Sequence, residues 1–321
     1  LLGADAAVSA MGVPYTRIFM LFAPLFMINR CISAFTRNDG APRTAMVAVF
    51  LSGVFNIVFD YIFMFPMKLG IAGAALATGI APIVSFLICG THLFSKKCSI
   101  RMKNWRPSWH RIVQSAQLGT AAFIGDIASA ITMLVFNFLI LSLTGNVGVA
   151  AFGVVCNIAL VATAVFNGIA QGAQPLFSDF YGKQERKPLQ ETLRLAMGTS
   201  LAFALLFILV FNLFPAQIVS IFNTEQNAAM AALGVVGMRL YFIGYLFAGI
   251  NIVGTGYLSA TEAALGSVIV SISRGVVAII LSALVMSWLF GMTGVWLAFT
   301  VAEALTATLL FLVLKKQKRS K

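Results

Sequence analysis

The feature that most constrains this chain is a series of apolar runs, each about as long as a bilayer is thick. A membrane-spanning helix needs about 20 consecutive, mostly apolar residues. Such runs cover residues 15–35, 44–65, 70–94, 112–143, 149–175, 192–214, 237–258, 265–290 and 293–314. The pattern predicts an all-α polytopic membrane protein with about nine transmembrane helices.

Composition points to the same class of protein. Of the 321 residues, 60% are apolar and 10% are charged, and the mean hydropathy is +0.94. Soluble domains usually carry about 25% charged residues, and disordered chains need low hydrophobicity. Zinc-protease, serine-hydrolase and phosphate-loop motifs are missing from the sequence. We therefore expect a protein that is not an enzyme.

Cysteine and histidine usage shows no metal-binding pattern. The four cysteines form no Cys-x-x-Cys pair, and the only histidines are His92 and His110. Three of the cysteines also lie in or beside apolar runs. We therefore predict no metal centre, no disulfide framework and no cofactor other than a transported ion.

Positive charge is clustered between the apolar runs. Most of the 22 Lys and Arg residues fall in one set of alternate connections and the C-terminal tail. Because such an excess marks cytoplasmic loops, we expect a multi-pass protein of the bacterial cytoplasmic membrane with a cytoplasmic C-terminus. The net charge of +12 then encodes orientation and not a nucleic-acid partner. Tryptophans 105 and 109 are expected at the inner interface, and Trp288 and Trp296 at the outer one.

An internal repeat relates the two ends of the chain. With a shift of 222 residues, Arg17 falls over Arg239 and Asn29 over Asn251. After a slip of one residue, the paired glycines of 70–73 fall over those of 291–294. Parallel repeats occur in transporters, and chance similarity between apolar helices is the alternative.

The repeat predicts the domain organisation. Residues 1–94 form three helices of an N-terminal lobe, residues 95–111 a basic cytoplasmic connector, and residues 112–321 a complete six-helix C-terminal lobe. The six-helix partner of the second lobe would begin about 110 residues before Leu1. We therefore expect a two-lobed, twelve-helix (6+6 parallel repeat) protein that lacks its first three helices here.

Polar side chains inside the apolar runs are costly, so each is a candidate for function or for packing between helices. Asn157, Asn167, Gln171 and Gln174 recur at helical spacings along 149–175 and predict one polar helix face. We interpret this face as the wall of a wet cavity, with packing as the alternative. Three weaker cavity candidates on the preceding run are Met133, Phe136 and Asn137.

Four of the charged residues within the runs are also candidates. Asp126 falls near the middle of the bilayer, where it either carries a proton or cation or is permanently paired. Asp60 lies towards the outer side, where Arg17 could neutralise it, and a coupling-ion or a structural role is open for it. Arg274 and Glu303 lie at equal depth, which permits a structural ion pair; a coupling-ion role for Glu303 is the alternative.

Seven motifs in order resemble the multidrug and toxic compound extrusion (MATE) transporters, and their MepA-like branch most closely. They are RNDGAPR at 37–43, NIVFDY at 56–61, LGIAGAALAT at 69–78, GIAQGAQP at 168–175, YGK at 181–183, GVW at 294–296 and AE at 302–303. The resemblance implies a monomeric antiporter. It would export small organic, often cationic compounds by alternating access, coupled to H⁺ or Na⁺.

The resemblance also implies roles for single residues. Asp126 matches the acid on the first helix of the second lobe and would bind the coupling cation, while Gln171 and Gln174 would line or hinge the cavity. Three departures weaken these assignments. The first three family helices are absent, 237–258 contains no carboxylate, and an Asp stands where close relatives have Glu.

Two other functions remain open. A lipid-linked precursor flippase of related fold needs a strongly cationic cavity, for which only Arg274 and Arg30 lie deep enough. The other alternative is an inactive fragment or a partner-dependent subunit. In either case an open lobe would expose its polar face to lipid, which is costly unless another chain covers that face.

Overall fold

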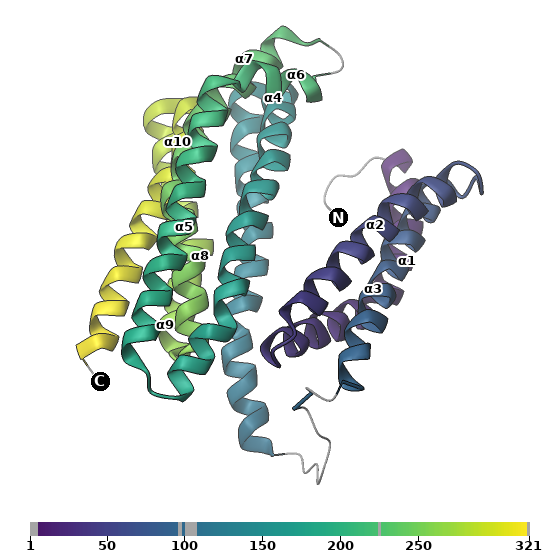
Figure 1. Cartoon of the computed structure of the whole chain (residues 1–321). Helices are drawn as coiled ribbons and strands as arrows, with labels where there is room; N and C mark the ends of the chain where they lie inside the picture. Colours follow the sequence, from purple (N-terminus) through teal and green to yellow (C-terminus); the bar gives the residue numbers. More distant parts are fainter. Residues whose placement is uncertain (1–5, 96–97, 100–107, 224–225, 320–321) are drawn as a thin grey trace. The chain divides into compact units, whose positions relative to one another are not determined.

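The computed structural model describes residues 6–95, 98–99, 108–223 and 226–319 (Figure 1). Within its helices, side chains are not described at 6–11, 117–118, 121–122, 124–126, 128–129 and 318–319. The chain forms two compact units, a first unit of Leu1–Arg106 and a second unit of Pro107–Lys321. The regular elements of the described residues are all helical.

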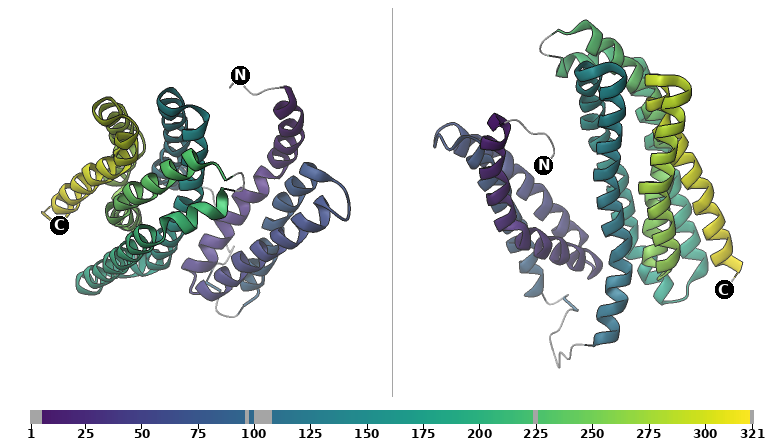
Figure 2. Two further views of the ribbon diagram at one scale, coloured as in Figure 1. Left: turned by 90° about the horizontal axis from the view of Figure 1, so that it is seen from above. Right: turned by 180° about the vertical axis from the view of Figure 1, so that it is seen from behind.

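The first unit consists of three long helices. They are α1 (Ala6–Asn38), α2 (Pro42–Met64) and α3 (Gly70–Leu93). Helix α3 packs against both α1 and α2, as Figure 2 shows. Small side chains such as Ala48, Ala75 and Ala77 are fully buried at these contacts. Since lipid gives apolar helices no hydrophobic reason to associate, close backbone approach through small residues is what holds such helices together.

The second unit contains the remaining helices around an aromatic core. They are α4 (Trp109–Gly182), α5 (Arg186–Leu213), α6 (Pro215–Phe222), α7 (Ala228–Tyr241), α8 (Tyr245–Ala260), α9 (Ala264–Ile272) and α10 (Ala278–Arg319). A short 3₁₀ turn (Phe242–Gly244) joins α7 to α8, and a π turn (Ser273–Val277) joins α9 to α10. Phe166 lies against Tyr245, and Phe177 against Tyr257, at ring-centroid distances of 5.7 and 5.3 Å.

Helices α4 and α10 each double back on themselves. Gly145 (φ 66°, ψ −158°) and Gly291 (φ 56°, ψ −134°) reverse the chain (Figure 1). The rings of Phe136 and Phe152, on opposite sides of Gly145, stack 5.4 Å apart and show that the two arms of α4 run antiparallel.

The two hairpins explain the number of membrane crossings. Seven stretches of the described residues are long and apolar enough to span a membrane. The two longest, Ala130–Gly182 and Ala264–Gln317, have 53 and 54 residues, or about 80 Å of helix at 1.5 Å per residue. Because the hydrocarbon core is about 30 Å thick and each stretch contains one reversal, each supplies two crossings. The all-α polytopic architecture is therefore confirmed.

The matched glycines of the repeat share two features in the two units. Gly70 has a φ of 55° and Gly291 a φ of 56°. A Cβ on Gly73 would lie 2.8 Å from the backbone of Phe63, and a Cβ on Gly294 would overlap the carbonyl oxygen of Met286. In both units the first glycine takes a positive φ, and the second lets the following helix lie against the preceding one.

We expect Gly291→Ala to destabilise the protein by about 1–3 kcal/mol, because residues with a Cβ hardly populate this backbone region. The matched control is Gly198→Ala in the middle of α5, where the added Cβ meets no atom within 4 Å. Alanine favours a helix over glycine, so the control should be neutral or slightly stabilising. Thermal midpoints of the detergent-solubilised variants measure both effects, and equal midpoints would contradict the turn's role.

Two aromatic residues lie elsewhere than the sequence predicts. Phe136, expected to line a cavity, is 1% exposed and packs inside the second unit against Phe152. Trp296, expected at the outer interface, is 0% exposed, and its ring lies where a Cβ on Gly237 would clash. Both fill core space beside small residues or other rings. Trp288 is 83% exposed, and residue 105 is outside the described residues.

Candidate functional site

The second arm of α4 has one buried and one exposed face. Phe152, Phe166 and Phe177 point into the core of the second unit and are at most 3% exposed. Asn157, Asn167, Gln171 and Gln174 define what we call the polar face; the first three are exposed and Gln174 is half-buried. From 157 to 174 this face runs for about 25 Å at 1.5 Å per residue, most of the thickness of a bilayer core.

The polar face is unsuited to contact with lipid. Amide side chains in hydrocarbon cost several kcal/mol unless they meet water or a polar partner. Leu160 and Val161, which are 68% and 65% exposed, adjoin the amides. A surface that combines apolar area with a few polar groups is typical of sites for small organic molecules.

The first arm of α4 contributes fewer groups. Met133 is 54% exposed and Asn137 is half-buried, one helical turn apart. Asp126 belongs to α4, but its side chain is outside the described residues. By sequence spacing Asp126 precedes Met133 by two helical turns.

A buried polar cluster joins three helices of the second unit. Arg274 Nε, in the π turn, lies 2.8 Å from Glu303 Oε1 and 3.1 Å from Oε2. Asn251 on α8 donates from Nδ2 to Glu303 Oε2 at 2.6 Å and to the Glu303 carbonyl at 2.9 Å. The side chain of Glu303 is 4% exposed and that of Arg274 is 32% exposed.

Sequence reasoning gave Arg274 and Glu303 equal depth but missed Asn251 as their partner. Asn251 is 0% exposed and lies 52 residues before Glu303. Its match to Asn29 in the repeat was the available signal, although that match carries no information about contacts. With three donor contacts on its two carboxylate oxygens, Glu303 is held as a structural acceptor, which favours the structural role over the coupling-ion role.

Asp60 lies on α2 in the first unit. Its Oδ1 atom is buried and accepts no hydrogen bond from the described residues. Arg17, the expected neutralising group, is exposed, and no ion pair joins it to Asp60 in the described part of the chain. One turn before Asp60, Asn56 Nδ2 lies 3.4 Å from Thr78 Oγ1 on α3. Asp60 therefore stays a candidate for the coupling-ion role, and the expected ion pair with Arg17 is not seen among the described residues.

Repeated crossings, two units with matching turns and a long polar face within the membrane define a polytopic helical membrane transporter. The sequence matches the MatE family model over residues 1–62 and 121–284. The chain therefore belongs to the MatE family, whose members are transporters and not enzymes.

The chain is also similar to named proteins. It is 29% identical to the multidrug export protein MepA of Staphylococcus saprophyticus over 98% of this chain and 69% of the relative. An outward-facing multidrug resistance MATE transporter has the same fold, with a TM-score of 0.89 and 22% identity. The match covers 97% of this chain and 70% of that transporter. A transporter from Pyrococcus furiosus also has this fold, with a TM-score of 0.90 and 21% identity over 97% of this chain and 70% of that protein. A different function is suggested for that protein from the reverse polarity of its binding pocket, so the fold leaves the substrate open.

Proposed function

We propose that the protein exports drugs or other toxic organic compounds by antiport against H⁺ or Na⁺. The observation that carries this proposal is the polar face of α4, exposed on a helix whose opposite face is buried. Family membership and the multidrug export function of the MepA relative support it. In this proposal the substrates are cationic and largely apolar, and the interleaved amides and aliphatic side chains offer polar and apolar contacts to such compounds.

In this proposal Asp126 binds the coupling cation in one orientation of the transporter and releases it in the other. A carboxylate is the only ionisable group in the first arm's apolar stretch, and intramembrane acids commonly carry protons or cations. Asp60 is the second candidate, because Oδ1 has no donor among the described residues. We place the C-terminus and the basic stretch 95–111 in the cytoplasm on the distribution of Lys and Arg.

The role of the polar face is tested by the double variant Asn167→Leu/Gln171→Leu. We expect export of ethidium, a cationic aromatic probe, from bacteria without other exporters to fall roughly tenfold, the equivalent of about 1.4 kcal/mol. The matched control is Leu176→Met, a volume-conserving change at an exposed apolar position of the same arm. Export should continue in the control. If the double variant, present in the membrane in the same amount as the parent, exports ethidium undiminished, the polar face is not part of the substrate site.

The flippase alternative gains no support from the second unit. It requires a free, deep positive charge for an anionic headgroup, and Arg274 is paired with Glu303 at 2.8 Å. A charge neutralised in this way attracts a phosphate only weakly.

A further inference from the structure

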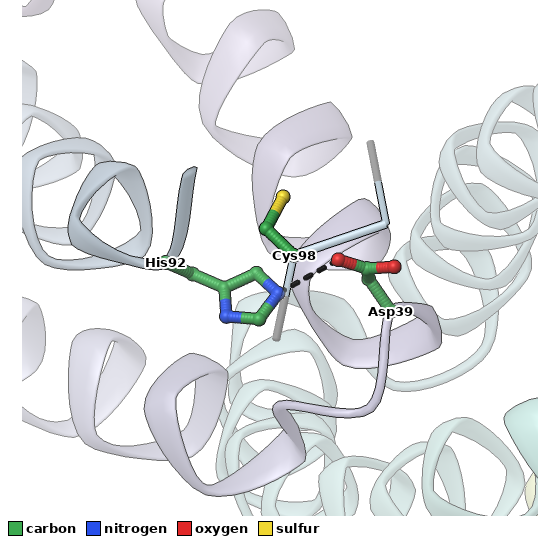
Figure 3. Close-up of side chains that lie close together, drawn as sticks. All are labelled: Asp39, His92 and Cys98. Atoms are coloured by element: carbon green, nitrogen blue, oxygen red, sulfur yellow. Dashed lines mark hydrogen bonds and ion pairs between the residues drawn. The ribbon is translucent and has the colours of Figure 1, made fainter. Parts of the chain in front are cut away.

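Three potential metal ligands from distant parts of the sequence meet at one end of the first unit. Asp39 follows the end of α1, His92 is in the last turn of α3, and Cys98 lies beyond α3 (Figure 3). A carboxylate oxygen, an imidazole nitrogen and the thiol sulfur all lie within 4.8 Å of one another. The transport proposal gives these residues no role, although Asp39 lies within the range that the family model matches.

The carboxylate at the centre of this group is already held in position. His92 Nε2 lies 2.8 Å from Asp39 Oδ2, and the Ser99 amide donates to the same oxygen at 3.0 Å. The Ser99 hydroxyl donates to Oδ1. These hydrogen bonds, from Ser99 first and His92 second, lower the pKa of Asp39 to about 2. The side chains of His92 and Asp39 are only 6% and 7% exposed, so both are largely shielded from competing water.

A cavity of about 350 Å³ borders the group, and His92 is part of its wall. Other lining residues are Gly40, Pro42, Arg43 and Ser95. The cavity gives a metal ion an entry path and a position for a fourth, non-protein ligand. Because Arg43 also lines the cavity, its positive charge would favour an anionic fourth ligand such as hydroxide or chloride.

We propose that Asp39, His92 and Cys98 form a Zn²⁺-binding site with an open fourth position. Sulfur, nitrogen and oxygen donors together suit zinc, which prefers four ligands in tetrahedral geometry. Bond lengths of about 2.0–2.3 Å place tetrahedral ligands roughly 3.3–3.7 Å apart. His92 Nε2 and Asp39 Oδ2, now 2.8 Å apart, therefore have to separate slightly to admit the ion, and the thiol has to turn towards it. Cys98, which forms no disulfide, is near enough to do so by rotation of its side chain.

Binding replaces contacts that the three side chains make now. Cys98 gives up its thiol proton and binds as a thiolate, and His92 binds through Nε2 with its remaining proton on Nδ1. The hydrogen bond between His92 and Asp39 is exchanged for two bonds to the metal. The ion then ties the end of α1, the end of α3 and residue 98 together, and so fixes the first residues that follow α3.

The alternative is a purely structural role for Asp39 as an acceptor of hydrogen bonds. In that role Ser99, His92 and, as the smallest contributor, the Cys98 thiol are hydrogen-bond partners of the carboxylate. Serine at position 98 would keep such a donor but would not bind a metal as a thiolate does. The two accounts therefore differ most sharply in what they predict for Cys98.

Cobalt(II) titration of the whole chain in detergent, purified with a tag free of histidine, tests the site. We expect one equivalent to bind with a thiolate-to-cobalt charge-transfer band, and Zn²⁺ to displace it. Cys98→Ser should abolish the band and weaken binding by at least about tenfold, the lower end of the loss seen when even outer-shell partners of a metal are removed. Asp39→Asn and His92→Gln should weaken binding similarly. The matched controls are Cys31→Ser and His110→Gln, at exposed positions, which should leave the titration unchanged.

A second readout guards against misfolded variants. A ligand that binds only the folded state raises the thermal midpoint, so Zn²⁺ should raise it for the parent and for Cys31→Ser but not for Cys98→Ser. Equal cobalt affinity in the parent and Cys98→Ser, or loss of the band in Cys31→Ser alone, overturns the proposal. Neither measurement depends on transport, so failure here leaves the proposed export function intact, and the reverse also holds.

Discussion

Asp126→Asn is expected to reduce export to the level of cells that carry no transporter, while leaving the protein folded and able to bind substrate. The physical reason is that asparagine has nearly the shape of aspartate but cannot take up and release a proton or exchange a sodium ion. Without that exchange the gradient no longer drives a cycle. Export driven by imposed pH or sodium gradients in proteoliposomes, alongside ethidium binding, measures the two properties separately.

The same helix supplies the matched control. Asp179→Asn makes the identical chemical change at a site that is half exposed and whose ion-pair partner is Lys183, four residues on, at 2.7 Å. Exposed pairs contribute about 0–1 kcal/mol, so export should stay close to that of the parent. If Asp126→Asn still exports along an imposed gradient, Asp126 is not the coupling residue, and Asp60→Asn becomes the decisive variant.

Arg274→Met is expected to destabilise the second unit by about 3 kcal/mol, at the lower end of the range for breaking a buried ion pair. The Glu303 side chain, which is 4% exposed in the parent structure, then loses its positive partner and keeps the hydrogen bond from Asn251. Glu303→Gln should cost less, because Arg274 is 32% exposed and its long side chain can turn towards water. Thermal unfolding of both variants in detergent gives the two values.

The double variant Arg274→Met/Glu303→Met completes the cycle. Replacing both charges by apolar groups is often neutral, so the double variant should be more stable than Arg274→Met alone. Additive losses would show that the pair does not interact energetically. Continued gradient-driven export by the double variant would also exclude Glu303 as a coupling residue.

The architecture follows largely from the sequence. Spanning segments are visible because lipid demands long apolar runs, and their turns because Gly145 and Gly291 occupy backbone regions that other residues avoid. The pairing of Arg274 with Glu303 could be predicted from their equal depth in the membrane. Two opposite charges deep in one lobe have few other groups with which to pair.

The side on which a residue lies is harder to predict. In a membrane, lipid-facing and core-facing positions are both apolar, so hydrophobicity did not separate Phe136 and Trp296 from residues that face outwards. Contacts between distant segments leave no local pattern either. His92 lies 53 residues from Asp39, and Asn251 meets Glu303 only because α8 and α10 pack together.

The hairpin turns also decide where the chain tolerates added sequence. Reversal at Gly145 and at Gly291 is achieved by single residues whose neighbours are already helical, so an inserted epitope or protease site there would have to unwind both arms. The short connection between α4 and α5 begins at Lys183, is exposed, and already departs from helical geometry at Gln184 (φ 60°). A reporter peptide placed in that connection gives a practical handle for determining which side of the membrane it occupies in intact cells.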